Sequence, residues 1–142
     1  MASQTPPILI TSQAIDLSAR FRGTTTVVAS PAASSETIIA SVTLSDAMQV
    51  ISNVKLFGWA AFTVGTNGVS AKLNVRKTDV SGTIVGTTGA LTVTAANLVA
   101  FSCPGLDTGA TLPGQVYVLT LTIGSGSATS TVSAVNLRAE II

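Results

Sequence analysis

Six carboxylates and one thiol are the side chains of this sequence best suited to chemistry. They are Asp16, Glu36, Asp46, Asp79, Asp107, Glu140 and Cys103. The sequence has no histidine, which excludes a Ser-His-Asp arrangement and leaves only all-oxygen metal sites. Asp46, Asp79 and Asp107 fall in expected turns, where aspartate side chains bond the local backbone. This distribution does not indicate the pair of positioned titratable groups that general acid–base catalysis usually needs.

Two further features could suggest an active site. Asp107-Thr108-Gly109 matches the active-site triplet of aspartic proteases, but it lies in a glycine-rich stretch and we interpret the match as chance. Cys103 is the single cysteine, so it can form no internal disulfide and, without histidine, no zinc site. We expect it to be a small buried hydrophobe. The sequence therefore predicts no enzymatic activity, no cofactor and no metal.

Charge is scarce along the whole chain. Only 9% of the 142 residues are charged and the net charge is +1, which provides no basic face for nucleic acid. No apolar run approaches the roughly 18–20 residues that a membrane-spanning helix needs. Met1 to Arg20 lacks both a basic start and a continuous apolar stretch, so we expect no secretory signal.

The residue pattern is that of β-strands throughout. Thr, Val and Ile are abundant, and apolar residues alternate with polar ones, which favours half-buried strands. The strands we predict are Thr24–Ala29, Glu36–Leu44, Val54–Val64, Val69–Lys77, Thr83–Val85, Ala90–Thr94, Leu98–Cys103, Gln115–Ile123 and Thr129–Ile141. This many short strands in one small domain indicate an all-β, two-sheet β-sandwich, with a jelly roll preferred and an immunoglobulin-like sandwich as the alternative.

Glycine and proline mark the connections between these strands. Gly65 to Gly68 reads as a hairpin loop, because Asn67 and Gly68 can adopt positive φ. Asp79 to Gly82 and Gly86 to Gly89 read as turns. Pro104 to Gly114 reads as the longest connection, without regular structure.

Residues 1–23 differ from the β-sandwich domain that we assign to residues 24–142. A proline pair disfavours a central strand near the start, while Ile15, Leu17, Ala19 and Phe21 then alternate with polar residues. Two interpretations remain open: an ordinary first strand, or an arm that adds to the sheet of a neighbouring subunit.

The strand Val54–Val64 carries aromatic residues on both faces. Phe57 and Trp59 share one face and Phe62 lies on the other. Either Phe62 faces the core and Trp59 lies at an interface, or the reverse holds. Exposed aromatic rings are also the platforms on which sugar-binding sandwiches stack their ligands, and Trp59 is a candidate for that use.

The surface of this domain must be covered largely by serine and threonine hydroxyls, since thirteen charges cannot cover it. Interface cores are depleted of Lys, Glu and Asp, so we expect much of the surface to meet other protein. Three features carry a family resemblance: the extension Met1–Gly23, the Ser/Thr/Val/Ala-rich strands Val69–Lys77 and Gln115–Ile123, and the closing strand to Ile142. In these features the chain resembles the capsid decoration (cement) proteins of tailed bacteriophages. That resemblance implies a jelly-roll or related β fold that trimerises on the head exterior and reinforces it.

We therefore expect a non-enzymatic virion structural protein, made in the host cytoplasm, that decorates and stabilises the outside of an assembled capsid. Its expected partners are copies of itself in a homotrimer and the major capsid protein shell, with no nucleic acid and no membrane. The expected interface residues are Ile8, Ile10, Ile15, Leu17, Arg20, Phe21, Arg22 and Trp59. The alternatives are a cell-surface filament or adhesin subunit and a carbohydrate-binding module.

Overall fold

The structure is a computed structural model that describes residues 24–25, 31, 34–44, 53–66, 68–94, 97–109, 114–124 and 130–142. The strands are β1 (Thr24–Thr25), β2 (Glu36–Thr43), β3 (Val54–Val64), β4 (Val69–Lys77), β5 (Ile84–Thr87), β6 (Leu91–Val93), β7 (Val99–Asp107), β8 (Val116–Ile123) and β9 (Ser130–Ile141). Among the described residues, no helix is long and apolar enough to cross a membrane. The expected arm, residues 1–23, lies outside the described residues.

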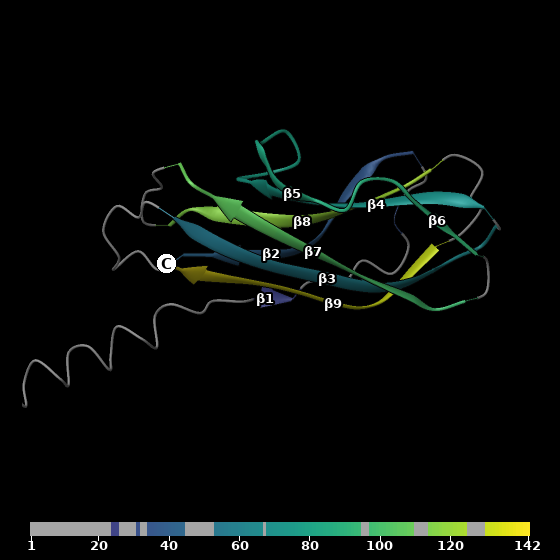
Figure 1. The fold of residues 1–142 in the computed structure, drawn as a ribbon. Coiled ribbons are helices and arrows are strands. Elements are labelled where there is room, and N and C mark those ends of the chain that lie inside the picture. The colour runs from purple at the N-terminus through teal and green to yellow at the C-terminus, as the bar shows by residue number, and fades with distance from the viewer. Residues whose placement is uncertain are drawn as a thin grey trace, which may run out of the picture.

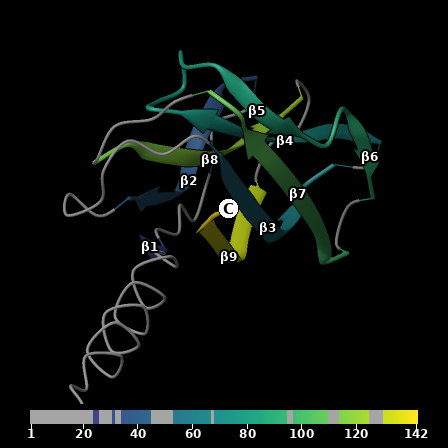
Figure 2. The same ribbon diagram turned by 60° about the vertical axis from the view of Figure 1, so that its left-hand side comes forward.

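The strands form two antiparallel sheets that face each other (Figures 1 and 2). One sheet is six-stranded, with the order β1-β2-β8-β4-β5 and with β6 also paired to β4; the other is three-stranded, with the order β7-β3-β9. From β2 to β4, and again from β6 to β9, each successive strand lies in the other sheet. The predicted all-β, two-sheet sandwich is confirmed, and this alternation between sheets is typical of jelly-roll winding.

The core lies between the sheets, where the inward-facing residues of both meet. Val54, Leu56 and Phe62 of β3 are fully buried, as are Leu119 and Leu121 of β8. The inward position of Gly58 admits Leu119 from the opposite sheet, because a Cβ at residue 58 would lie 2.9 Å from Leu119 Cδ1. The faces predicted from the alternating pattern in β4, β8 and β9 are the ones that the structure buries.

Three expectations about connections were wrong. The first is the turn expected from Gly86 to Gly89, because Gly86 and Thr87 belong to β5 and pair with β4. Gly65 to Gly68 does not close a hairpin, because β3 and β4 belong to different sheets; the loop carries the chain from one sheet to the other. Gly68 does adopt a positive φ of 74°, and its N–H donates to the carbonyl of Val93. Pro104 to Asp107 is not loop either: β7 continues through Asp107, paired with β3 down to Val54.

The two sheets approach each other closely where β5 meets β7. A Cβ at Gly86 would lie 2.4 Å from the carbonyl oxygen of Pro104, and one at Gly105 would lie 3.1 Å from that of Val85. Two glycines therefore allow the edge strands of the two sheets to come together. Because Pro104 has no N–H, β7 also lacks one backbone donor at this position, which limits pairing with further strands.

Candidate interaction surface

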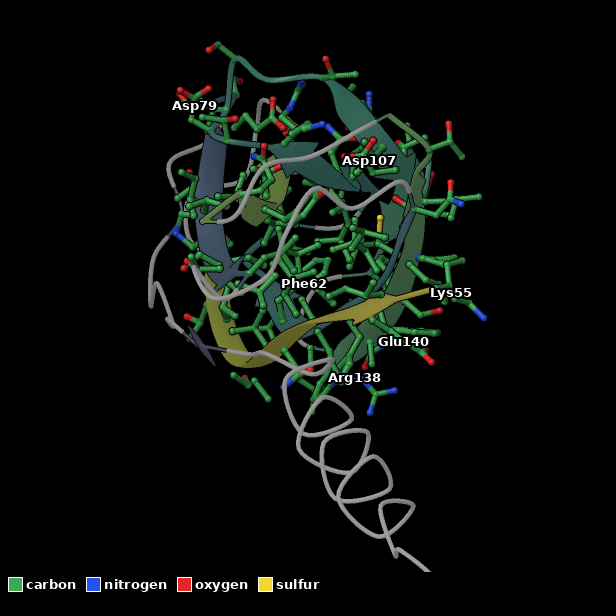
Figure 3. All side chains as sticks on the ribbon, turned by 90° about the vertical axis from the view of Figure 1, so that its left-hand side faces the viewer. Lys55, Phe62, Asp79, Asp107, Arg138 and Glu140 are labelled. Carbon is green, nitrogen blue, oxygen red and sulfur yellow. The ribbon has the colours of Figure 1, made fainter. Side chains whose placement is uncertain are left out.

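The outer face of the three-stranded sheet carries the exposed aromatic residues. Strand register places its side chains in rows across β7, β3 and β9. The rows are Leu106–Lys55–Glu140, Pro104–Phe57–Arg138, Ser102–Trp59–Asn136 and Ala100–Ala61–Ala134. We call these four rows the aromatic face. Figure 3 shows Lys55, Arg138 and Glu140 pointing outward on one side of the molecule, whereas Phe62 lies between the sheets.

Phe57 and Trp59 have different surroundings on the aromatic face. Lys55 Nζ and Arg138 Cζ each lie 5.2 Å from the centroid of the Phe57 ring, within the range of cation–π attraction. Trp59, by contrast, is 42% exposed. Phe62 faces the core, as one of the two interpretations of β3 predicted: it is 0% exposed and packs edge-on against Phe101, with the ring centroids 5.6 Å apart. The expected interface at Trp59 stays a prediction.

A second exposed apolar region borders the aromatic face where β5 meets β7. Leu106 of β7, Ile84 of β5 and Ile142 are 50%, 41% and 60% exposed. We call these three residues the apolar flank. Beside them is a hollow of about 390 Å³ lined by Lys55, Val85, Pro104, Gly105, Leu106 and Ile142.

Asp107 lies at the end of β7 and links the two sheets. Its Oδ2 accepts hydrogen bonds from Tyr117 Oη at 2.7 Å and Lys77 Nζ at 2.9 Å, and its Oδ1 accepts one from the N–H of Gly109 at 2.9 Å. Burial alone would raise the pKa of Asp107, but the bonds from Tyr117, Lys77 and Gly109 outweigh it and lower the pKa. The expected bond to the local backbone is present, but Asp107 is a buried strand residue rather than an exposed turn residue.

Glu36 organises a polar network on the outer face of the six-stranded sheet. Arg76 binds it through two bonds, Nε to Oε1 at 2.7 Å and Nη2 to Oε2 at 2.9 Å. Asn74 Nδ2 and Thr120 Oγ1 also donate to Oε1. Burial would raise the pKa of Glu36, but these donors outweigh it and lower the pKa from 4.5 to about 2. The four side chains come from β2, β4 and β8 and tie these strands together.

Two other candidate groups have local partners. Cys103 is fully buried between the sheets, as predicted, and burial raises the pKa of its thiol to about 11. Asp79 accepts hydrogen bonds from the backbone N–H and the hydroxyl of Ser81, which lower the pKa of Asp79. In the part of the chain that the structure describes, no group of three or more Cys, Asp or Glu residues could hold a metal ion.

Of the interface residues expected from the sequence, Trp59 is the one that the structure describes. Ile8, Ile10, Ile15, Leu17, Arg20, Phe21 and Arg22 lie outside the described residues. The apolar flank was not foreseen. The glycine and proline residues between Pro104 and Gly114 predict a loop at Leu106, and apolar residues do not alternate regularly there, so the sequence holds no clear signal for this part of β7.

Comparison with known proteins finds the fold in chains of virus structures. No family model and no curated protein sequence matches the chain. Among solved structures, a chain of the infectious bursal disease virus Gt strain is similar with a TM-score of 0.53 and 16% identity over 86% of this chain and 33% of that one. A chain of the Gx strain is similar with a TM-score of 0.52 and 14% identity over 86% of this chain and 32% of that one. The xylan-binding domain of Paenibacillus barcinonensis Xyn10C has a TM-score of 0.41 and 18% identity over 84% of this chain and 83% of that domain.

The similarity to the two viral chains shows a shared fold. The present chain spans about a third of the length of those viral chains. The class of molecule that follows is a two-sheet β-sandwich of the kind found in virus structures.

Proposed function

We propose that this chain is a virion structural protein without enzymatic activity, which decorates and stabilises the outside of a tailed-bacteriophage capsid. The observation that carries the proposal is the apolar flank, where Ile84, Leu106 and Ile142 are exposed and where Leu106 and Ile142 line a largely apolar hollow. The fold shared with chains of a virus structure supports it.

The apolar flank has the composition of an interface core. Its side chains are large and apolar, and among the described residues that line the hollow Lys55 is the one with a charge. Cores of protein interfaces are depleted of charge, and apolar area removed from water contributes roughly 25 cal/mol for each Å². We propose that the flank contacts the major capsid protein of the shell.

Oligomerisation strengthens such a contact. In our proposal the protein is a homotrimer, and residues 1–23 form an arm whose Ile8, Ile10, Ile15, Leu17, Arg20, Phe21 and Arg22 contact a neighbouring subunit or the shell. Three flanks on one particle bind with an effective concentration set by the assembly, so modest individual contacts produce high avidity. Synthesis in the host cytoplasm and assembly onto preformed heads follow from this role.

Co-sedimentation with capsid shells of the virus that encodes the protein tests the proposal. Leu106→Asp places a charge in the flank and should reduce shell binding at least ten-fold. Val80→Asp is the matched control, because Val80 is 42% exposed but lies in the β4–β5 turn outside the flank. Equal binding by the wild type and Leu106→Asp would contradict the role of the flank, and no binding by the wild type would contradict the proposed function.

A further inference from the structure

The row that contains Trp59 has polar side chains on both sides of the exposed ring. Ser102 of β7 and Asn136 of β9 are the direct register partners of Trp59, and both are exposed. Directly opposed residues on neighbouring strands have Cβ atoms about 4.5–5.5 Å apart. A partly exposed indole with a hydroxyl-bearing and an amide-bearing neighbour therefore lies on an outer sheet surface.

We propose that this row is a glycan-binding platform, on which a pyranose ring stacks against Trp59 while Ser102 and Asn136 hydrogen-bond its hydroxyls. The proposal goes beyond the capsid role. The axial C–H groups of a pyranose present an apolar, weakly positive face that complements the negative face of an aromatic ring. Its equatorial hydroxyls project sideways, toward the positions that Ser102 and Asn136 occupy.

The dimensions of the row suit one sugar. Two strand spacings separate β7 from β9, or about 10 Å, close to the width of a pyranose with its equatorial substituents. Ala100, Ala61 and Ala134 form the next row, about 7 Å further along the strands. Because these side chains are small, they leave room above the sheet for an oligosaccharide that extends from Trp59 in this direction.

The other aromatic ring on this face is not available for stacking. Phe57 has Lys55 and Arg138 over its ring, so among the described residues of this face Trp59 is the aromatic side chain left for stacking. Lys55 lies directly opposite Glu140, Arg138 lies over the Phe57 ring, and the Trp59 row itself carries no charged side chain. The groups beside Trp59 are therefore those that hydrogen-bond a neutral sugar.

The ligand class that fits is a β-1,4-linked oligosaccharide of glucose or N-acetylglucosamine. Both sugars carry their ring substituents equatorially, which leaves flat C–H faces for stacking. An axial hydroxyl would interrupt such a face. The amide of Asn136 can both donate and accept, so it can bond a sugar hydroxyl or an N-acetyl group.

Trp59 is the single tryptophan of the chain, so intrinsic tryptophan fluorescence reports this site directly. Titration of the full chain with cellohexaose and, separately, chitohexaose should produce a saturable fluorescence change for at least one of them, with Kd at or below about 1 mM, the weak end of specific binding. Asn136→Ala and Ser102→Ala should each weaken binding about five-fold, as expected for one net hydrogen bond. Thr131→Ala, an exposed position on β9 outside the row, is the matched control and should leave Kd unchanged.

Calorimetry extends the test to Trp59→Ala, which has no tryptophan signal and should show no binding while its circular dichroism stays that of the wild type. The proposal is overturned if neither sugar changes the fluorescence up to 10-fold above 1 mM, or if Trp59→Ala binds as the wild type does. A fluorescence change that capsid shells produce and sugars do not would overturn it too, and would assign Trp59 to a protein interface. Shell binding through Leu106 can succeed or fail independently of these results.

Discussion

Replacing Glu36 with glutamine would remove the acceptor charge at the centre of the polar network on the six-stranded sheet while keeping the side chain's size. Glutamine has no charge and keeps only one acceptor oxygen, so Arg76 would lose its ion pair and the bond from Nη2, and Asn74 and Thr120 would lose a carboxylate acceptor. The side chains of Arg76 and Glu36 are only 17% and 21% exposed, so water replaces these bonds incompletely. We expect Glu36→Gln to destabilise the fold and to change its response to acid.

The pKa of Glu36 sets the size of the effect. The pKa of this carboxyl falls from 4.5 to about 2 on folding. Since each tenfold change in proton affinity corresponds to roughly 1.4 kcal/mol, the ionised group stabilises the folded state by about 3 kcal/mol. Because the folded pKa is the lower one, this stabilisation is fully present above pH 4.5 and is lost as the pH falls toward 2. Partial exposure reduces the expected value to about 2–3 kcal/mol.

Urea unfolding at pH 7, 4.5, 3.5 and 2.5 measures this contribution. Glu36→Gln should be less stable than the wild type by about 2–3 kcal/mol at pH 7, and the difference should shrink as the pH falls from 4.5 toward 2. Glu140→Gln is the control: its carboxylate lies on the aromatic face opposite Lys55, where an exposed pair contributes at most about 1 kcal/mol. A constant difference between the wild type and Glu36→Gln at all four pH values would refute the reasoning.

Three further predictions follow from the contacts of buried groups. Tyr117→Phe removes a hydrogen-bond donor from the buried Asp107 and should lower the free energy of unfolding, measured with urea, by about 1–3 kcal/mol. An unchanged unfolding midpoint would contradict a stabilising link between the sheets at this bond. Gly86→Ala places a Cβ against the carbonyl of Pro104 and should cost about 1–3 kcal/mol, measured as a lower Tm; an equal or higher Tm would contradict the close approach. Cys103 should resist a thiol reagent at pH 8 until urea unfolds the protein, because burial raises its pKa to about 11; rapid modification of the native protein would show that it is accessible.

The strands and their inward faces could be predicted from the sequence because they follow from a local signal. In Val69–Lys77 apolar and polar residues alternate, and the apolar face is the one that β4 packs into the core, although Asn74 of the opposite face is buried too. In β8 the predicted face of Tyr117, Leu119, Leu121 and Ile123 lies in the core, but Val118 and Thr120 of the opposite face are buried as well. A period of two needs no knowledge of the partner strand.

Strand partners could not be predicted in the same way. The segment from Gly65 to Gly68 has the composition of a hairpin turn. The strands before and after it, however, belong to different sheets, and each packs its apolar face into the core from its own side. Which sheet a strand joins depends on contacts between residues far apart in sequence. Pro104 and Gly105 likewise look like loop residues, although in β7 they allow the close approach to β5.

The candidate surfaces, too, could be predicted only where a local pattern determines them. The alternation in Val54–Val64 leaves two possible orientations of the strand, and the structure, with Phe62 buried, has the one that exposes Trp59. The neighbours of Trp59 could not be predicted, since Ser102 and Asn136 lie 43 and 77 residues away in sequence and are brought there by register. The Glu36 network was missed for the same reason, because Arg76 and Thr120 are 40 and 84 residues from Glu36.

Electron microscopy of virus particles purified on a density gradient tests most directly the proposed position of the protein on the outside of a capsid. We expect the protein to co-purify with full and empty heads in a fixed ratio to the major capsid protein. We also expect density for a β-sandwich on the outer surface, arranged in threes. Absence of the protein from purified particles, or its density inside the shell, would contradict the proposed function.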